Sequence, residues 1–211
     1  MPFTINHSNN TSCISCKFNN KNYHELFKNM ILSIFSNIID ITFKYHENND
    51  FIDILFHNTK LDRFSSWNFD NKHSYLIASN CFKDITYQIK LLKEFNKSFI
   101  AFDNNDIIVL TDKNNHSHFF IANFDILYNL HNNYVYITSP PLMSTLYFSP
   151  ELKSIKILPS QLYHSSVYYS LGLFLLQIFD NTKLIIHTPL YYSISRCMYQ
   201  NPNKRLLLST Y

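Results

Sequence analysis

The cysteines and histidines are the residues of this chain whose types and spacing could bind a metal ion. Cys13 and Cys16 are separated by two residues, which is the spacing of half of a zinc site. The second half is missing, because Cys81 and Cys197 are isolated and the histidines, His164 among them, form no set of metal ligands. We therefore expect a reduced cysteine pair in a strand, no disulfides and an intracellular location.

Phosphate binding by a glycine-rich loop is excluded by the glycine content. Gly172 is the only glycine in 211 residues, whereas average usage would supply about fifteen. Glycine lets the backbone approach a phosphate closely or turn with a positive φ angle. Walker-type loops and dinucleotide-binding fingerprints both need several glycines, so neither is expected anywhere in the chain.

Composition and charge limit the remaining function classes. The chain is 46% hydrophobic and 17% aromatic, which is enough for one compact domain or for two small lobes that share a core. The net charge is +3 and the lysines are scattered, so no nucleic-acid partner is expected. The longest apolar run, residues 167–179, is too short to span a bilayer, and the first residues do not resemble a signal peptide. The abundance of Asn, Ile, Lys, Phe and Tyr suggests an AT-rich viral or microbial genome. For a viral protein, the expected intracellular, cytoplasmic location would be the host cytoplasm or the virion.

The periodicity of apolar residues predicts the elements that position any site. Residues 74–95 carry the longest helical stripe, and short apolar runs separated by Asn and Asp turns indicate strands after it. Strands are expected at residues 12–18, 41–45, 51–56, 99–102, 107–110 and 119–122, and helices at residues 23–40, 74–95, 165–179, 190–200 and from 204 onward. Residues 1–10 are expected to be frayed and residues 129–149 to be irregular. Strands that gather early and helices that gather late predict an α+β fold.

Three short motifs in the second half of the chain resemble motifs of the protein kinase superfamily. Ser149-Pro150-Glu151 is similar to the Ala-Pro-Glu that closes a kinase activation segment, Tyr169-Ser170-Leu171-Gly172 to the Trp-Ser-x-Gly that opens the buried central helix, and Asn201-Pro202-Asn203-Lys204-Arg205 to the late Asp-Pro-x-x-Arg motif. The resemblance covers residues 11–211. It implies a protein-kinase-like fold with a reduced N-lobe at residues 11–57, made of a few strands and one helix, and a mainly helical C-lobe at residues 58–211. It also implies a buried ion pair between Glu151 and Arg205.

The resemblance further implies a degenerate catalytic loop. In kinases a His-Arg-Asp loop supplies the catalytic base, and an Asn five residues after that Asp binds Mg²⁺. Residues 99–106 align with this loop and place Ala101, whose methyl group cannot accept a proton, at the position of the base. Asp106 stands at the position of the Asn, where a carboxylate could still bind Mg²⁺. Asp103 is the one nearby substitute for the base, although a turn residue is the interpretation that we favour.

The metal-binding Asp-Phe-Gly motif of kinases is altered as well. Asn123-Phe124-Asp125 follows the strand expected at residues 119–122. The resemblance implies either Asn123 as a weak, neutral Mg²⁺ ligand or, with a shift of two residues, Asp125. No glycine follows in either register.

The expected strand at residues 12–18 resembles the one that carries the nucleotide-binding lysine of kinases. Lys17 stands in that place, and Glu25, early in the next helix, would be its ion-pair partner. An ordinary surface lysine and a glutamate favoured at a helix start explain both residues equally well. So few residues precede this strand that the two strands and the glycine-rich loop that cover ATP in kinases are not expected.

We therefore interpret the chain as a catalytically impaired kinase-like protein, a pseudokinase, that binds a protein partner and for which no cofactor is expected. The irregular segment at residues 129–149 and the aromatic-rich surface would supply the contacts. A second hypothesis is a residual or atypical ATP-dependent serine/threonine kinase that uses Asp103 or Asp125 with Asp106 and binds ATP and Mg²⁺ with the help of Lys17. A third is an unrelated α+β protein whose motifs are coincidental.

Overall fold

The computed structural model describes residues 3–8, 10–17, 22–37, 39–46, 51–68, 71–141, 147–179 and 185–208, and it has an α+β fold. Two compact units divide the chain. The first unit contains Met1–Trp67 and Asn105–Asp125, and the second unit contains Asn68–Asn104 and Ile126–Tyr211. This grouping puts residues 58–67 and 105–125 in the first unit, whereas the sequence analysis assigned them to the C-lobe.

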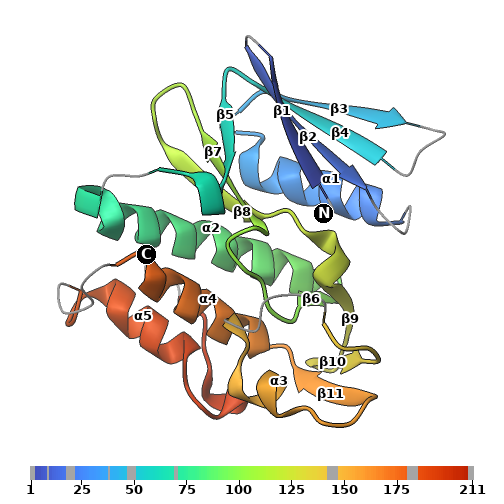
Figure 1. Ribbon diagram of the computed structural model, residues 1–211, viewed down its shortest axis with the longest axis vertical. Helices are drawn as coiled ribbons and strands as arrows, with labels where there is room; N and C mark the ends of the chain where they lie inside the picture. The colour runs from blue at the N-terminus through green and yellow to red at the C-terminus, as the bar shows by residue number, and fades with distance from the viewer. Residues whose placement is uncertain are drawn as a thin grey trace. The chain divides into compact units, whose positions relative to one another are not determined.

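The larger sheet of the first unit is antiparallel, with the strand order β1-β2-β4-β3. Its strands are β1 (Phe3–Ser8), β2 (Thr11–Lys17), β3 (Ile41–His46) and β4 (Phe51–His57). Alternate residues of β2 and β4 are buried, because successive side chains of a strand point to opposite faces. The helix α1 (Asn22–Phe35) lies against the buried face (Figure 1), where the ring centroids of Phe35 and Phe56 are 6.5 Å apart.

The first residues of the chain form a strand, so the prediction of a frayed segment is wrong for residues 3–8. β1 pairs with β2 in a register that puts Phe3 opposite Cys16. Phe3 is 1% exposed, and the Arg63 guanidinium lies 4.0 Å from its ring centroid and donates to its carbonyl oxygen at 2.7 Å. The apolar alternation of β1 is limited to Phe3 and Ile5, which is too short to predict a strand. The order of β1 comes from pairing and from a partner 60 residues later.

The smaller sheet of the first unit has three antiparallel strands in the order β5-β7-β8. They are β5 (Lys60–Arg63), β7 (Ile107–Thr111) and β8 (Ser117–Ile121); the 3₁₀ turns η1 (Phe64–Ser66) and η3 (Phe124–Ile126) follow β5 and β8. In the β7–β8 turn, Oδ1 of Asp112 accepts hydrogen bonds from the backbone N–H groups of Asn114 and His116 at 2.8 and 2.9 Å. Aspartates favour turns because their side chains satisfy the backbone in this way.

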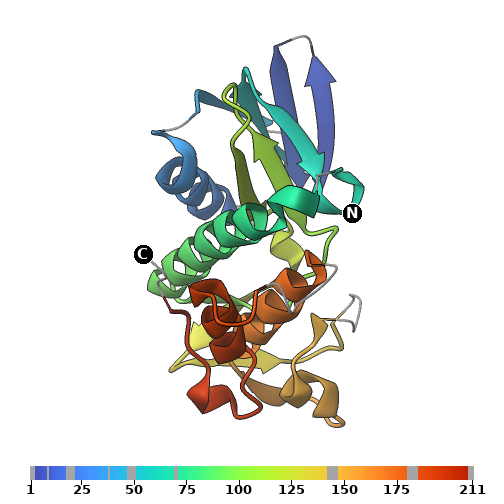
Figure 2. The ribbon, with the colours of Figure 1, turned by 90° about the vertical axis from the view of Figure 1, so that its left-hand side faces the viewer.

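The second unit is organised around the long helix α2 (Ser74–Glu94). Helices α4 (Ser166–Gln177) and α5 (Pro189–Cys197) pack against each other, and α4 also packs against α2 (Figure 2). An antiparallel sheet in the order β11-β10-β9-β6 is formed by β6 (Lys97–Phe99), β9 (Leu127–His131), β10 (Tyr134–Ile137) and β11 (Ser160–Tyr163). The short helix α3 (Pro150–Ser154) and the 3₁₀ turns η2 (Asn71–His73) and η6 (Pro202–Lys204) complete the unit. Across the described ranges of both units, none of the helices combines the length and the apolar character needed to cross a membrane.

Two secondary-structure predictions for the second unit are wrong. The segment at residues 129–149 contains the end of β9 and all of β10, in which Val135 and Ile137 are fully buried; residues 142–146 lie outside the described residues. The described residues after η6 are not helical, although a helix was expected from residue 204. Arg205 is extended, with φ −75° and ψ 135°, and its side chain turns inward to the contacts described below.

Gly172 allows α4 and α5 to approach closely. A Cβ atom at this position would collide with Cγ of Met198 and would lie 3.4 Å from Cβ of Cys197. We expect Gly172→Ala to lower the free energy of unfolding by about 1 kcal/mol, because overpacking costs about 1–3 kcal/mol and alanine recovers about 1 kcal/mol of helix propensity. Urea denaturation measures this change. In a Met198→Ala background, where the space is free, the same substitution should stabilise the protein; destabilisation there would contradict the packing argument.

Candidate functional site

Glu151 and Arg205 form the ion pair that the kinase resemblance implies, in the second unit, with Arg205 buried and Glu151 partly buried. Nη1 of Arg205 lies 2.5 Å from Oε1 of Glu151, and Nη2 donates to Oε2 at 2.7 Å. The side chain of Arg205 is 0% exposed and that of Glu151 is 21% exposed. Helix α3 presents Glu151 and begins with Pro150 in its first turn and with Ser149 as its N-cap, whose Oγ accepts from the backbone N–H of Leu152 at 3.4 Å.

All five N–H donors of Arg205 are occupied. Besides the two bonds to Glu151, Nε donates to the carbonyl oxygen of Tyr199 at 2.7 Å, Nη1 to that of Ser165 at 3.2 Å and Nη2 to that of Gln200 at 3.1 Å. A guanidinium group has five donors and no acceptor, so this one has none left for a ligand. The pair therefore ties α3, the start of α4 and the chain after α5 together, and its role is structural.

Ala101 stands at the position that the resemblance assigns to the catalytic base, and it is buried. It is 0% exposed and belongs to a hydrophobic cluster of the second unit with Val135, Leu152 and Leu162. A methyl group in such a cluster cannot take a proton from a substrate hydroxyl. The environment of residue 101 is therefore that of a core residue.

Asp103, the alternative base, precedes a turn at residues 104–106 and is partly exposed. Burial, and after it the charge of Asp103, raises the pKa of Tyr147 to about 12. The Tyr147 phenol therefore stays protonated at neutral pH, and its hydroxyl lies within hydrogen-bonding distance of Oδ1 of Asn104, at 2.7 Å, and of Oε1 of Gln177. Asp103 thus lies beside a protonated phenol and next to a turn, which is an environment suited to a turn residue.

Asp106 and Asn123 are brought together in the first unit by the β7–β8 hairpin. Asp106 is 7% exposed, and its Oδ1 accepts a hydrogen bond from Nδ2 of Asn123 at 2.6 Å. The backbone pairs here too, because the N–H of Ala122 donates to the carbonyl oxygen of Asp106 at 2.8 Å. Burial lowers the pKa of the nearby Arg63 guanidinium, and the negative charge of Asp106 acts against that shift. The Asp106 carboxylate is therefore held by an amide and faces a cation.

Of the two registers left open by the sequence, the structure puts Asn123 beside Asp106 and leaves the Asp125 side chain exposed. Asn123 also orders the following turn, since its Oδ1 accepts from the backbone N–H of Asp125 at 3.1 Å. One carboxylate and one amide are few ligands for Mg²⁺, which prefers six oxygens around it. Among the described residues, no group of three or more His, Cys, Asp or Glu side chains is arranged to hold a metal ion.

Lys17 and Glu25 do not form the ion pair that the resemblance implies. Lys17 is exposed at the end of β2, with Nζ 5.8 Å from the ring centroid of Phe51, and Glu25 on α1 accepts a hydrogen bond from the Tyr45 hydroxyl at 3.3 Å. Within the described residues, no salt bridge joins the two side chains. The alternation of β2 explains the difference: Cys16 points to the face covered by α1, so Lys17 points to the opposite face.

The cysteines occupy positions that rule out a shared site at Cys13 and Cys16. Because the two residues lie three apart on β2, Cys13 is half exposed on the outer face and Cys16 is buried on the inner one. Burial raises the pKa of the Cys16 thiol above its ordinary range. All four cysteines are free thiols, so the expectation of no disulfides agrees with the structure.

His164 follows β11 in the second unit and is 4% exposed, and no role was expected for it from the sequence. Its Nδ1 lies 2.7 Å from Oγ of Ser98, and the two residues are 66 positions apart in the chain. A contact at that separation leaves no local pattern in the sequence. The one available signal is the position of a histidine directly before a strongly apolar helix, where burial is expected.

Comparison with known proteins does not assign the chain to a family. The residues and contacts described above are therefore what can support a function. No family model matches the chain, and no curated protein matches it.

Proposed function

We propose that this chain is a kinase-like protein that has lost phosphoryl transfer and acts as a protein-binding or regulatory module. The observation that carries the proposal is the contact between Glu151 and Arg205. Two side chains 54 positions apart, each singled out by its own short motif, meet in a buried bidentate pair. Coincidental motif matches would give no reason for these two side chains to meet.

The surroundings of α4 support the proposal in the second unit. The Ser170 hydroxyl of α4 donates to the carbonyl oxygen of Tyr147 at 2.7 Å, and the hydroxyls of Ser149 and Ser166 are 2.6 Å apart in a buried contact. The helix that carries Tyr169-Ser170-Leu171-Gly172 is therefore packed against the Ser149-Pro150-Glu151 motif. A buried central helix beside that motif is what the resemblance implies.

The order of elements in the first unit also supports the proposal. Helix α1 joins two strands of an antiparallel sheet, which is the content that the resemblance implies for a reduced N-lobe. The β7–β8 hairpin brings together Asp106 and Asn123, which the resemblance aligns with the two positions where a kinase binds Mg²⁺.

The residues present do not fit an ATP–Mg²⁺ complex that supports catalysis. Ala101 offers no proton acceptor, Lys17 points to the face of its sheet away from α1, and Asp106 is already bonded to Asn123. Phosphoryl transfer depends almost wholly on positioning and on stabilisation of charge, and the loss of one such contact costs about a hundredfold or more in rate. Several losses together favour a binding role over a catalytic one.

A binding role needs surface anchors, and the second unit offers exposed aromatic side chains. Tyr192 is 56% exposed, Tyr136 49% and Tyr199 40%. Tyrosine is enriched among the residues that dominate binding energy at protein interfaces, since it combines a large apolar ring with a polar end. We infer that the partner is a protein.

A thermal-shift titration with ATP and Mg²⁺ tests the loss of nucleotide binding. We expect no Mg²⁺-dependent change in Tm at millimolar nucleotide, because a ligand stabilises a protein only if it binds the folded state. The alternative, a residual ATP-dependent serine/threonine kinase, rests on the contact between Asp106 and Asn123. It requires a rise in Tm that depends on Mg²⁺, disappears in Asp106→Ala and persists in Asp112→Ala, a control on the β7–β8 turn. That pattern would replace the proposal by the alternative.

A further inference from the structure

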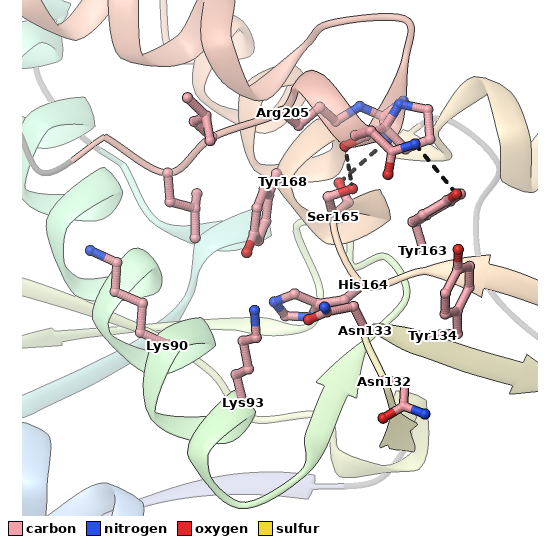
Figure 3. A pocket seen from close by; sticks show the side chains of 14 residues that line it. Lys90, Lys93, Asn132, Asn133, Tyr134, Tyr163, His164, Ser165, Tyr168 and Arg205 are labelled. Carbon is pink, nitrogen blue, oxygen red and sulfur yellow. Dashed lines mark hydrogen bonds between the residues drawn. The ribbon is translucent and has the colours of Figure 1, made fainter.

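A cavity of about 560 Å³ lies in the second unit, between α2, the β9–β10 turn, the end of β11, the start of α4 and the segment after η6 (Figure 3). Its volume is within the range of pockets that hold small organic ligands. The side chains that give it chemical character are Lys90 and Lys93 of α2, His164 before α4 and Tyr168 on α4.

The cavity carries positive charge. Lys90 and Lys93 are three residues apart on α2 and so lie on the same face of that helix. In Figure 3 the amino end of Lys93 and the hydroxyl of Tyr168 point toward the ring of His164. No Asp or Glu is among the described residues that line the cavity, and the donors of Arg205, which forms part of its wall, are all in use. Lys93 therefore favours an anion.

The hydrogen bonds of His164 determine which ring nitrogen carries the proton. Nδ1 lies 2.7 Å from Oγ of Ser98, and the same hydroxyl donates to the carbonyl oxygen of Phe99 at 2.8 Å. A serine hydroxyl has one hydrogen, so the bond to Ser98 must be donated by Nδ1. Burial, and after it the charge of Lys93, lowers the pKa of His164 to about 4, so the ring is neutral at pH 7. Its Nε2 is then an acceptor with a lone pair.

This acceptor is buried without a protein donor. His164 is 4% exposed, and within the described part of the chain its Nε2 makes no hydrogen bond. A buried polar atom without a partner is destabilising, so such an atom at a cavity wall indicates a ligand that donates a hydrogen bond to it. Tyr168 completes the set: its ring lies edge-on to His164 at 5.1 Å, and burial raises its pKa to about 12, so it remains an O–H donor.

We propose that this cavity binds a small phosphate compound that also carries a hydroxyl group. Lys93 and the Tyr168 hydroxyl contact the phosphate oxygens, and the ligand hydroxyl donates to Nε2 of His164. The hydroxyl belongs either to phosphorus, as in HPO₄²⁻, or to a carbon skeleton attached to the phosphate. Sulfate and simple carboxylates are disfavoured by the same arrangement, since at neutral pH they bring negative charge to Nε2 and no proton.

Isothermal titration calorimetry on the full chain at pH 7 tests the proposal with three probes: inorganic phosphate, glycerol 3-phosphate and sodium sulfate. At least one phosphate should bind, and sulfate should bind about tenfold more weakly or worse, because it lacks the hydrogen bond to Nε2. Tighter binding of inorganic phosphate would assign the hydroxyl to phosphorus, and tighter binding of glycerol 3-phosphate would assign it to carbon.

Two variants distinguish specific phosphate binding in the cavity from non-specific attraction of phosphate to a basic surface. Lys93→Gln should weaken phosphate binding about tenfold, the effect of one lost charge-assisted hydrogen bond. Lys83→Gln makes the same change of charge on α2 outside the cavity lining and should have no effect. Equal binding of sulfate and phosphate, equal effects of the two variants, or binding of neither phosphate probe would each overturn the proposal.

A measurement on the unaltered protein avoids dependence on folding of the variants. The ¹⁵N resonance of the unprotonated Nε2 of His164, assigned by its loss in His164→Phe, should move upfield when phosphate is added, as a lone pair does when it accepts a hydrogen bond. Sulfate at the same ionic strength should leave it in place. A resonance that does not respond to phosphate would contradict the assigned role of His164.

Discussion

Glu151→Ala is expected to lower the free energy of unfolding by about 3–5 kcal/mol, because it leaves a buried guanidinium without its counter-charge. Arg205 is 0% exposed, and the substitution removes the acceptors of two of its five hydrogen bonds while the three backbone carbonyls remain. Three carbonyl dipoles cannot replace a carboxylate as the partner of a guanidinium group that is itself fully buried. Urea denaturation followed by circular dichroism measures the loss as a lower midpoint.

Glu94→Ala is the matched control, since Glu94 is exposed at the end of α2 and its removal should change stability by less than about 0.5 kcal/mol. A second variant, Glu151→Gln, keeps the shape of the side chain and removes only its charge, so its loss should be intermediate. If Glu151→Ala behaved like the control, the pair would not be structural, and the main support for the proposed kinase-like fold would be gone.

Acidification from pH 7 to pH 5 should destabilise the wild-type protein by about 2 kcal/mol more than it destabilises His164→Phe. Burial and the nearby Lys93 charge lower the pKa of His164 from 6.5 to about 4. Between these values the unfolded chain binds a proton at this residue and the folded chain does not. The stability contributed by neutral His164 is therefore complete above pH 6.5 and is lost progressively as the pH falls toward 4.

Phenylalanine is suited to this comparison because it fills the ring volume without a titratable group, and the Ser98 hydroxyl keeps its bond to the carbonyl of Phe99. Urea midpoints in phosphate-free buffers at several pH values give the two curves, and their difference isolates His164 from the other histidines and from the carboxylates. Parallel curves for the two proteins would mean that His164 has an ordinary pKa in the fold.

Elements with a strong local pattern could be predicted from the sequence. The predicted bounds of α2, β7 and β8 are close to the observed ones. The helix buries one continuous stripe of apolar side chains and the two short strands bury most of their residues, so each leaves a clear apolar pattern in the sequence. β1, β5 and β11 were missed because short or polar strands are ordered by their neighbours in the sheet, and those neighbours are not visible in a local window.

The candidate site residues likewise differ in how much of their environment could be predicted from the sequence. Glu151 and Arg205 could be paired in advance because each belongs to a motif, and a motif carries information about distant contacts. The face of the sheet to which Lys17 points could not be predicted, since a shift of one position along a strand moves a side chain to the opposite face. The contact between His164 and Ser98 could not be predicted, because the two residues are 66 positions apart and no local sequence pattern links them.

The division of the first unit into two stretches of chain has a consequence for biosynthesis. β5 pairs with β7, yet residues 68–104, which belong to the second unit, are made between them. A nascent chain on the ribosome therefore exposes one edge of β5 until the long α2 segment has emerged and the hairpin behind it has been translated. A fragment that stops at Trp67 would keep that edge open permanently, and we expect it to aggregate.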